Sequence, residues 1–401
     1  MLGTRIARQP LAPALLGLAA LLGSCQSTTQ EAVLDEYTLE LAPGQLGLVQ
    51  LPDGADWPDF SIGWPIREHM VDATDASLAY LSKPSSKGFF PYGPISHDRM
   101  VRSLERFREL LESSPSSEVF LSGLRDEFEV WVARGGSNAG DVLFTGYGTP
   151  IYKGSRTRTG VYQYPLYKLP DDLVKAENGD ILGRRTASGN IVPYYTHREL
   201  IDGGHLDGQE LVWISDAFDA YTAQVQGSAM IDLPDGERLE VGYAGKNGYD
   251  YKSIGQLLID EGRIKKSELS LARLRRYFSQ NPDEIDRVLP MNPSFVFFQE
   301  TPGGPYGCLG QPVTEMRSVA TDKDVFPRAG LMFIEVRLPD FAAHGGLVQR
   351  PERFFAFDQD RGGAIRSAGR CDIWMGLGED AMERAGHVLS RGRMYYLFLK
   401  E

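Results

Sequence analysis

The sequence predicts a mainly β fold with some helices, in the α+β class. Short strand-like runs, punctuated by Gly and Pro, fill residues 142–251 and return after Pro293. Apolar residues at helical spacing are concentrated before the first of these stretches and between the two. Neither an internal repeat nor a coiled-coil heptad pattern is visible. Separate β-rich and helical stretches are typical of α+β proteins.

The composition is that of a folded protein, with 42% hydrophobic and 10% aromatic residues in 401. This length predicts two to three domains and permits a large core. The formal net charge of −12 argues against a nucleic-acid partner, which requires a basic face. An anionic polymer would have to be bound through local hydrogen bonds and aromatic stacking.

The N-terminus has the pattern of an export signal. Arg5 and Arg8 precede an apolar stretch, 11–22, that is too short to span a bilayer. Residues 22–25, Leu-Gly-Ser-Cys, resemble the bacterial lipobox, so we expect a signal peptide over 1–24 and acylation of Cys25. The alternative is an ordinary signal peptide in which this cysteine is incidental. The residue after this cysteine is Gln, which by resemblance to enterobacterial lipoprotein sorting favours the outer membrane. We therefore expect an outer-membrane lipoprotein that faces the periplasm and is held by its lipid anchor alone.

Local patterns predict the elements along the chain. A helix is expected from His97 to about Glu112 and a second from Leu124 to Val132. Ser267 is the expected N-cap of a later helix. Turns are expected at 233–236 and 247–248, and short helices from Ile254 and from Pro282. Strands are expected over 142–147, 295–298, 331–336, 354–357 and 395–399.

Three carboxylates in the C-terminal third are the candidates for chemistry: Asp322, Asp360 and Asp372. Glycines beside an acid let the backbone approach a ligand closely. Acids near Gly turns are also common as loop caps or solvated charges, and the residues alone leave both interpretations open. Because the chain has no Cys-x-x-Cys motif and its histidines are scattered, we expect neither a metal nor a cofactor.

The spacing of these acids resembles a known domain. Residues 360–365, Asp-Arg-Gly-Gly-Ala-Ile, with Asp372 further on and Asp322 upstream, are similar to the three-Asp domain, a double-psi β-barrel. From about residue 60 onward the chain resembles the membrane-bound lytic murein transglycosylase A family. The segments that carry this resemblance are 144–147, 155–158, 164–167, 226–228, 241–248 and 292–298.

The chain departs from the family pattern in two places. Gly148 and Thr149 stand where the family often has Tyr-Glu, which puts one substrate contact in doubt. Arg361 stands inside the Asp-x-Gly-Gly turn.

The resemblance implies a divided architecture. After a tether and N-terminal segment over 25–59, residues 60–150 and 301–401 would form the barrel. Residues 151–300 would be an inserted second β-rich domain. The groove between the two domains would hold the glycan.

The resemblance also implies the reaction, cleavage of the β-1,4 bond between N-acetylmuramic acid and N-acetylglucosamine in peptidoglycan strands. Asp372 would act as acid and then as base and leave 1,6-anhydromuramic acid ends, which requires a raised pKa. Asp360 and Asp322 would support it, and for Asp360 the alternative is a purely structural turn cap. The alternatives are a non-catalytic peptidoglycan-binding lipoprotein and a hydrolase on the same barrel. A complex for cell-wall synthesis or division is left open.

The expected substrate contacts are short polar residues flanked by Gly and aromatic rings that stack on sugars. For Tyr249 and Trp374 core packing is an equal alternative, and Asn247 is also a simple turn residue. The full expected set is Thr145, Gly146, Tyr147, Gln226, Gly227, Ser228, Asn247, Tyr249 and Trp374.

Cys308 and Cys371 are left once Cys25 carries lipid. Both lie in the expected barrel, and an export signal would place them where disulfides persist. A bridge between them is the hypothesis, and two free thiols are the alternative.

Overall fold

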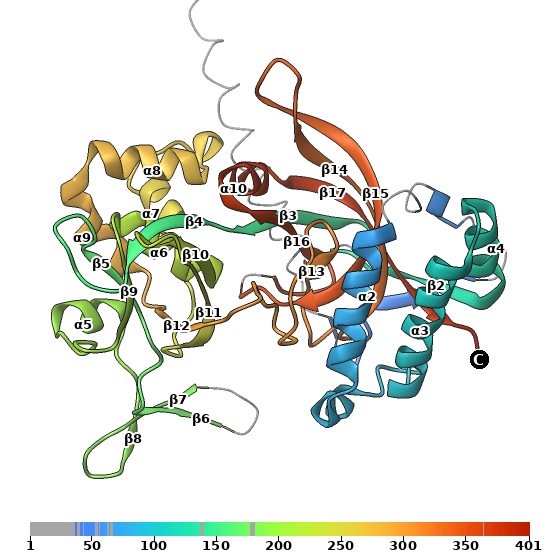
Figure 1. Cartoon of the computed structure of the whole chain (residues 1–401), viewed down its shortest axis with the longest axis horizontal. Coiled ribbons are helices and arrows are strands. Elements are labelled where there is room, and N and C mark those ends of the chain that lie inside the picture. The colour runs from blue at the N-terminus through green and yellow to red at the C-terminus, as the bar shows by residue number, and fades with distance from the viewer. Residues whose placement is uncertain are drawn as a thin grey trace, which may run out of the picture.

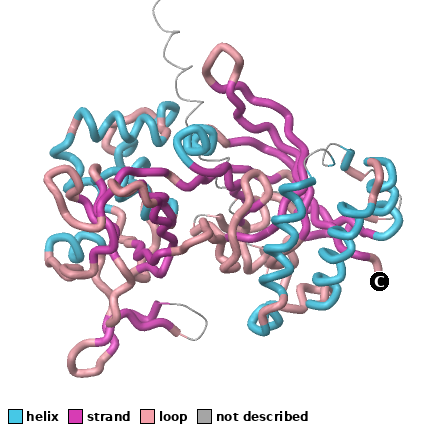
Figure 2. Tube along the Cα trace, viewed as in Figure 1, coloured by secondary structure: helices cyan, strands magenta, loops and turns pink. Residues whose placement is uncertain are grey.

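The computed structural model describes residues 37, 41–42, 44–52, 55, 57–61, 64, 67–136, 140–176, 181–363 and 365–401. Cys25 and the signal peptide lie outside these residues. The described chain forms two lobes (Figure 1). Strands occupy the middle of each lobe, and most helices lie toward the outside (Figure 2).

Six strands of the first lobe close into a barrel. The pairing runs β17-β14-β15-β13-β16-β3, and β3 pairs again with β17. Two further strands, β1 (Leu48–Gln50) and β2 (Phe128–Ala133), extend the sheet from β17. The barrel strands are β3 (Val142–Thr149), β13 (Ser318–Ala320), β14 (Leu331–Phe341), β15 (Leu347–Asp360), β16 (Arg370–Leu377) and β17 (Leu389–Leu399).

Aromatic side chains fill the core of this lobe. Phe107 of a covering helix packs against Phe355 of β15 with ring centroids 5.2 Å apart, and Phe333 lies 5.0 Å from the same ring. The helices of this lobe are α2 (Arg67–Leu81), η2 (Pro84–Phe89), α3 (His97–Ser113), α4 (Ser117–Glu127) and α10 (Gly378–Gly386).

The helix expected from His97 is confirmed as α3. Ser96 caps it by accepting a hydrogen bond from Arg99 N, and buried apolar residues recur along one face. The helix expected over 124–132 is wrong in its second half. Helix α4 ends at Glu127, and residues 128–133 form β2, where β-branched and aromatic side chains pair with β1 and β17.

The second lobe is built on a six-stranded sheet in the order β12-β11-β10-β4-β9-β5 and a small three-stranded sheet. The first comprises β4 (Ile151–Ser155), β5 (Tyr164–Tyr167), β9 (Glu210–Ile214), β10 (Ser228–Asp232), β11 (Arg238–Lys246) and β12 (Val296–Glu300). The second comprises β6 (Leu173–Lys175), β7 (Ile181–Arg185) and β8 (Ile191–Val192). Its helices are α5 (His197–Asp202), α6 (Ala217–Gln226), α7 (Ile254–Asp260), η3 (Lys266–Glu268), α8 (Leu271–Gln280), η4 (Pro282–Glu284), α9 (Ile285–Val288) and η5 (Leu289–Met291).

Turn and cap signals in this lobe are largely as expected. The 233–236 turn joins β10 and β11, with Gly236 at φ +87°. Helix α7 ends before Gly262, at φ +70°. The expected N-cap Ser267 is wrong, because Ser270 accepts the hydrogen bond from Arg273 N and starts α8.

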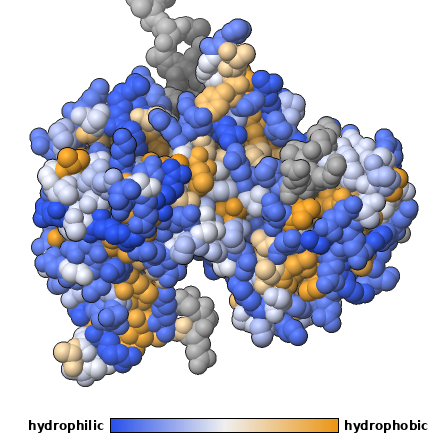
Figure 3. All heavy atoms as spheres, in the orientation of Figure 1, coloured by the Kyte–Doolittle hydropathy of each residue, from blue (hydrophilic) through white to orange (hydrophobic). Residues whose placement is uncertain are grey.

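The chain passes from barrel to insert through a single residue, Pro150, between β3 and β4, and returns through β12. The surface is hollowed between the two lobes (Figure 3). A barrel interrupted by a second β-rich domain confirms the predicted fold class. Within the described residues no helix is long and apolar enough to cross a membrane.

Candidate active site

Two of the candidate carboxylates lie in one row across the barrel wall. Ala320 of β13 pairs with Asp360 of β15 on one side and with Asp372 of β16 on the other. Asp372 in turn pairs with Thr145 of β3. Because directly opposed residues of neighbouring strands point to the same face, these side chains share one face of the sheet.

A β-bulge at Gln359 puts Asp360 in this row. Val319 pairs with Asp358 and Ala320 with Asp360, so β15 has one more residue than β13 at this point. Without the bulge, positions 358 and 360 would point to the same face. The side-chain amide of Gln359 holds the bulge, since it donates to Ala73 O at 2.7 Å and to Ser77 Oγ at 2.9 Å. The bulge therefore separates Asp358, which points inward, from Asp360.

Asp372 combines burial with an unoccupied oxygen. Burial raises its pKa to about 7, the Thr145 hydroxyl and the Arg370 charge act against this rise, and the Asp360 charge adds to it. Asp372 Oδ1 and Thr145 Oγ1 are both shielded from solvent, and neither makes a hydrogen bond of normal geometry to a described residue. The hydroxyl thus lies near enough to lower the pKa of Asp372, but it makes no hydrogen bond of normal geometry to Oδ1. A carboxyl of this kind is half protonated near neutral pH and able to exchange a proton with a ligand.

Asp360 is different, because both of its oxygens are occupied. Oδ2 accepts from Tyr147 Oη at 2.7 Å, and Oδ1 accepts from the backbone N–H of Cys308 and of Arg361, each at 2.8 Å. Burial raises its pKa, and these three hydrogen bonds act against the rise. Its contacts fit a supporting role, in which it fixes the turn and adds negative charge near Asp372.

Asp322 organises the chain at a distance from this row. Its Oδ1 accepts from Asp324 N at 3.1 Å, and its Oδ2 accepts from Ser367 N at 2.8 Å. The side chain is buried, and it ties the turn after β13 to the loop that leads into β16. Asp322 therefore supports the strand that carries Asp372.

The β3 residues of the expected site face helix α10 and the acids. A Cβ on Gly146 would stand 2.9 Å from Val388 Cγ2 and 3.0 Å from Ala385 Cα, so only glycine lets the end of α10 pack on this strand. Tyr147, the next residue, reaches Asp360. The strand thus carries Thr145 and Tyr147 to the two acids.

The segment 226–228 meets β3 from the insert. Gln226 Oε1 accepts from Gly148 N at 3.4 Å, and the hydroxyls of Ser228 and Thr149 lie 2.9 Å apart. Gly227, at φ +76°, ends α6 between them. The structure therefore places these three residues against the end of β3, at Gly148 and Thr149, directly after Tyr147.

The remaining expected contacts have structural partners. The amide of Asn247 donates to Tyr195 O and Pro293 O at 2.9 and 2.8 Å and accepts from Phe295 N at 2.9 Å. All its hydrogen-bonding groups are used to hold the turn.

The other two aromatic residues of the expected set, Tyr249 and Trp374, are also held by contacts within the protein. Tyr249 Oη donates to Tyr194 O at 2.9 Å. Trp374 is only 4% exposed, as the core alternative expects.

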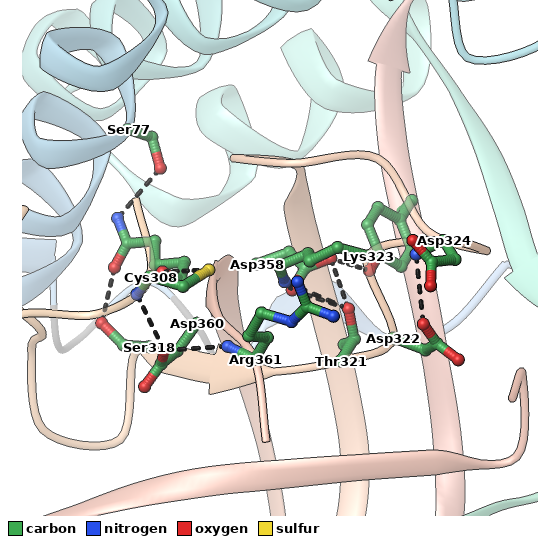
Figure 4. A network of polar contacts seen from close by, with 12 residues as sticks. Ser77, Cys308, Ser318, Thr321, Asp322, Lys323, Asp324, Asp358, Asp360 and Arg361 are labelled. Carbon is green, nitrogen blue, oxygen red and sulfur yellow. Dashed lines mark hydrogen bonds and ion pairs between the residues drawn. The ribbon is translucent and has the colours of Figure 1, made fainter. Parts of the chain in front are cut away.

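Sequence reasoning missed a buried polar network behind the site. Lys323 forms an ion pair with Asp358, and both side chains are fully buried. Asp358 also accepts from Thr321 Oγ1 at 2.7 and 2.9 Å and from Tyr396 Oη at 2.8 Å (Figure 4). The only sequence signal was an Asp-Lys-Asp run, which normally indicates a solvated turn.

The disulfide hypothesis is wrong, because Cys308 and Cys371 are both free. Cys371 lies in the barrel core, on the opposite face of β16 from Asp372. Cys308 is exposed, and its backbone bonds to Asp360 on the outer side of the wall. The two thiols thus belong to different sides of the sheet. In the part of the chain that the structure describes, no group of three or more His, Cys, Asp or Glu is arranged to hold a metal ion.

Residues 143–299 match the MltA specific insert domain, and residues 317–398 match the 3D domain. The chain belongs to the membrane-bound lytic murein transglycosylase A family, a family of peptidoglycan-cleaving enzymes.

Individual relatives agree with this assignment. Membrane-bound lytic murein transglycosylase A of Escherichia coli strain K12 is 34% identical over 272 residues, which cover 67% of this chain and 69% of the relative. The crystal structure of the membrane-bound lytic murein transglycosylase from Agrobacterium tumefaciens has a TM-score of 0.72 at 26% identity and covers 88% of this chain and 98% of its own. Escherichia coli MltA with bound chitohexaose has a TM-score of 0.67 at 27% identity and covers 91% and 97%.

Proposed function

We propose that this enzyme cleaves the β-1,4 bond between N-acetylmuramic acid and N-acetylglucosamine with a single catalytic carboxyl, Asp372, and leaves 1,6-anhydromuramic acid ends. The observation that carries the proposal is the contrast between the two neighbouring acids. Asp372 is partly buried, has a pKa of about 7 and has a shielded oxygen without a hydrogen bond to a described residue, whereas Asp360 has hydrogen bonds on both oxygens. An ordinary glycosidase needs two working carboxylates.

The Asp372 carboxyl alone is enough for both proton transfers of the proposed reaction. Protonated Asp372 donates to the glycosidic oxygen as the bond to C1 of the muramic sugar breaks. The C6 hydroxyl of the same sugar then attacks C1, and the Asp372 carboxylate accepts the hydroxyl proton. The acid is restored, no water is consumed, and a burial-tuned pKa near 7 suits both half-steps because neither direction of transfer is strongly uphill.

The glycan would lie in the hollow between the lobes (Figure 3). A solved relative, Escherichia coli MltA, holds chitohexaose, a chain of N-acetylated sugars. We propose direct contacts from Thr145, Gly146 and Tyr147 on β3 and from the facing segment 226–228. Asn247, Tyr249 and Trp374 would shape the walls, since their polar or apolar surfaces are already engaged.

Mass spectrometry of the muropeptides released from purified sacculi tests this function. We expect anhydro ends, each lighter by one water than a reducing end. Reducing ends would instead show a hydrolase. Retention on sacculi with no released products would show a non-catalytic binding protein.

The raised pKa of Asp372 predicts a pH dependence. Its protonated form is the one that starts the reaction, and that form persists up to a pH of about 7 and is lost above it. We expect kcat/KM on solubilised glycan strands to fall about tenfold per pH unit above that point. A profile that stays flat to pH 9, with the fold intact by circular dichroism, would contradict the assignment.

We also propose that acylated Cys25 tethers the enzyme to the outer membrane on its periplasmic side. The support is the lipobox-like sequence before Cys25 and the membrane-bound relatives. We predict that Cys25→Ala moves the protein from the membrane fraction to the soluble periplasmic fraction. Cys308→Ala is the matched control and should leave the fractionation unchanged. Persistent membrane association of Cys25→Ala would indicate another anchor.

A further inference from the structure

Arg361 lies in the Asp-x-Gly-Gly turn that begins at Asp360, and the proposed mechanism gives its side chain no role. Its backbone N–H donates to Asp360 Oδ1 at 2.8 Å, while its side chain is exposed. Figure 4 shows the side chain running away from the Asp360 carboxyl. The turn therefore fixes the position of the Arg361 backbone and leaves its guanidinium at the surface of the site.

This guanidinium has no acidic partner among the described residues. Some other arginines of the barrel lobe do have one: Arg350, Arg353 and Arg384 pair with carboxylates at 2.9, 3.1 and 2.8 Å. The chain has a net charge of −12, so acids are not scarce. An exposed arginine without a carboxylate partner, directly after Asp360, is the kind of group that meets a ligand anion.

The Arg361 charge faces the insert lobe. Burial raises the pKa of Tyr243 on β11, and the Arg361 charge acts against this rise. Tyr243 is 52% exposed, and its Cβ lies 3.9 Å from where a Cβ on Gly227 would stand. Arg361 of the barrel lobe is thus close to Tyr243 of the insert lobe, and Tyr243 borders Gly227 in the segment proposed to contact the sugars.

The same charge stays away from the catalytic acid. The charges that act on the pKa of Asp372 are those of Arg370 and Asp360. A cation closer to Asp372 would stabilise its ionised form and remove the proton that the reaction needs. Arg361 is therefore placed to hold an anion near the acid without ionising it.

We infer that Arg361 binds a carboxylate of the glycan strand beside the sugar held at Asp372, and so selects acidic strands. This inference rests on the proposed function, because the ligand is a peptidoglycan strand. Planar guanidinium and carboxylate groups pair through two parallel hydrogen bonds. Peptidoglycan offers this group in two places, the lactyl carboxylate of muramic acid once its peptide has been removed, and the carboxylates of the stem peptide.

The test measures binding in an Asp372→Asn background, where no ligand is consumed. Three ligands are titrated: peptide-free glycan strands, stem-bearing strands and neutral chitohexaose. We expect Arg361→Gln to weaken binding of one acidic ligand about tenfold and to leave chitohexaose unchanged. Arg361→Lys, which keeps the charge and loses the planar fork, should lie between. Arg350→Gln, an equal charge change on the β14–β15 hairpin, is the matched control and should alter none of the three.

The ligands distinguish the two sources. Loss confined to peptide-free strands assigns the lactyl carboxylate, and loss confined to stem-bearing strands assigns the peptide. Equal loss for all three ligands, or loss for none, overturns the inference. Binding does not depend on turnover, so this test and the product analysis can fail separately. The carboxylate preference can be present when no anhydro product forms, and the anhydro product can form when the preference is absent.

Discussion

Asp372→Asn should lower kcat by at least about 10²–10⁴-fold, the usual effect of removing a general acid. The amide has the same shape as the carboxyl, so the site keeps its geometry and loses only its titratable proton. Turnover is measured as release of soluble muropeptides from sacculi. The assignment fails if the variant melts at the wild-type temperature or above and keeps more than a few per cent of the activity.

The same substitution should increase stability above neutral pH. The folded-state pKa of Asp372 is raised from 3.8 to about 7, so the folded protein holds this proton more tightly than the unfolded chain does. Above about pH 4 this carboxyl ionises in the unfolded chain but stays protonated in the folded protein. The free energy of unfolding therefore falls as the pH rises, until the pH reaches about 7. The difference between the two pKa values limits the stability that Asp372→Asn gains at pH 8 to about 4 kcal/mol. Thermal melts at pH 5 and pH 8 should therefore show a larger gain for Asp372→Asn at the higher pH.

Asp360→Asn is the matched comparison. Asp360 accepts three hydrogen bonds, and an amide at this position replaces one acceptor oxygen by a donor group facing Tyr147 or the two backbone N–H groups. The pKa of Asp360 is also raised, so Asp360→Asn removes a similar cost to folding at high pH, but it gives up one acceptor oxygen. We therefore expect a smaller gain in melting temperature at pH 8 for Asp360→Asn than for Asp372→Asn.

Much of the barrel was predictable from sequence because its motifs are local. The Gly residues around Asp360 and the apolar runs of β14, β15 and β17 mark strands and turns that short windows detect. The difference between the proposed roles of Asp360 and Asp372 was expected only from the family resemblance. It depends on which oxygens are occupied, and those partners come from β3 and from the loop at Cys308, far away in the chain.

Other features depend on pairing that a sequence window does not contain. Residues 124–132 carry apolar spacing that fits a helix, yet their second half is a strand because β1 and β17 flank it. The disulfide hypothesis failed for a related reason. Adjacent residues of a strand point to opposite faces, so a cysteine next to Asp372 has to face the core. The bulge at Gln359 depends on hydrogen bonds to α2 and could not be read from β15 alone.

The network behind the site gives the largest expected change in stability. Lys323 and Asp358 pair with both side chains at 0% exposure, and the carboxylate also accepts from Thr321 and Tyr396. Removing one member of such a pair leaves a buried charge without compensation, which typically costs about 3–5 kcal/mol. We therefore expect Lys323→Met to lower the free energy of unfolding by that amount.

The effect can be measured by urea denaturation followed through tryptophan fluorescence. Arg350→Met breaks a pair whose side chains are 53% and 49% exposed, and this control should cost no more than about 1 kcal/mol. Adding Asp358→Leu to Lys323→Met should recover part of the loss, because no uncompensated charge is then buried. Recovery should be incomplete, since the Thr321 and Tyr396 hydroxyls lose their acceptor. If Lys323→Met costs no more than the Arg350 control, the pair is not a main support of the strands that hold the catalytic row.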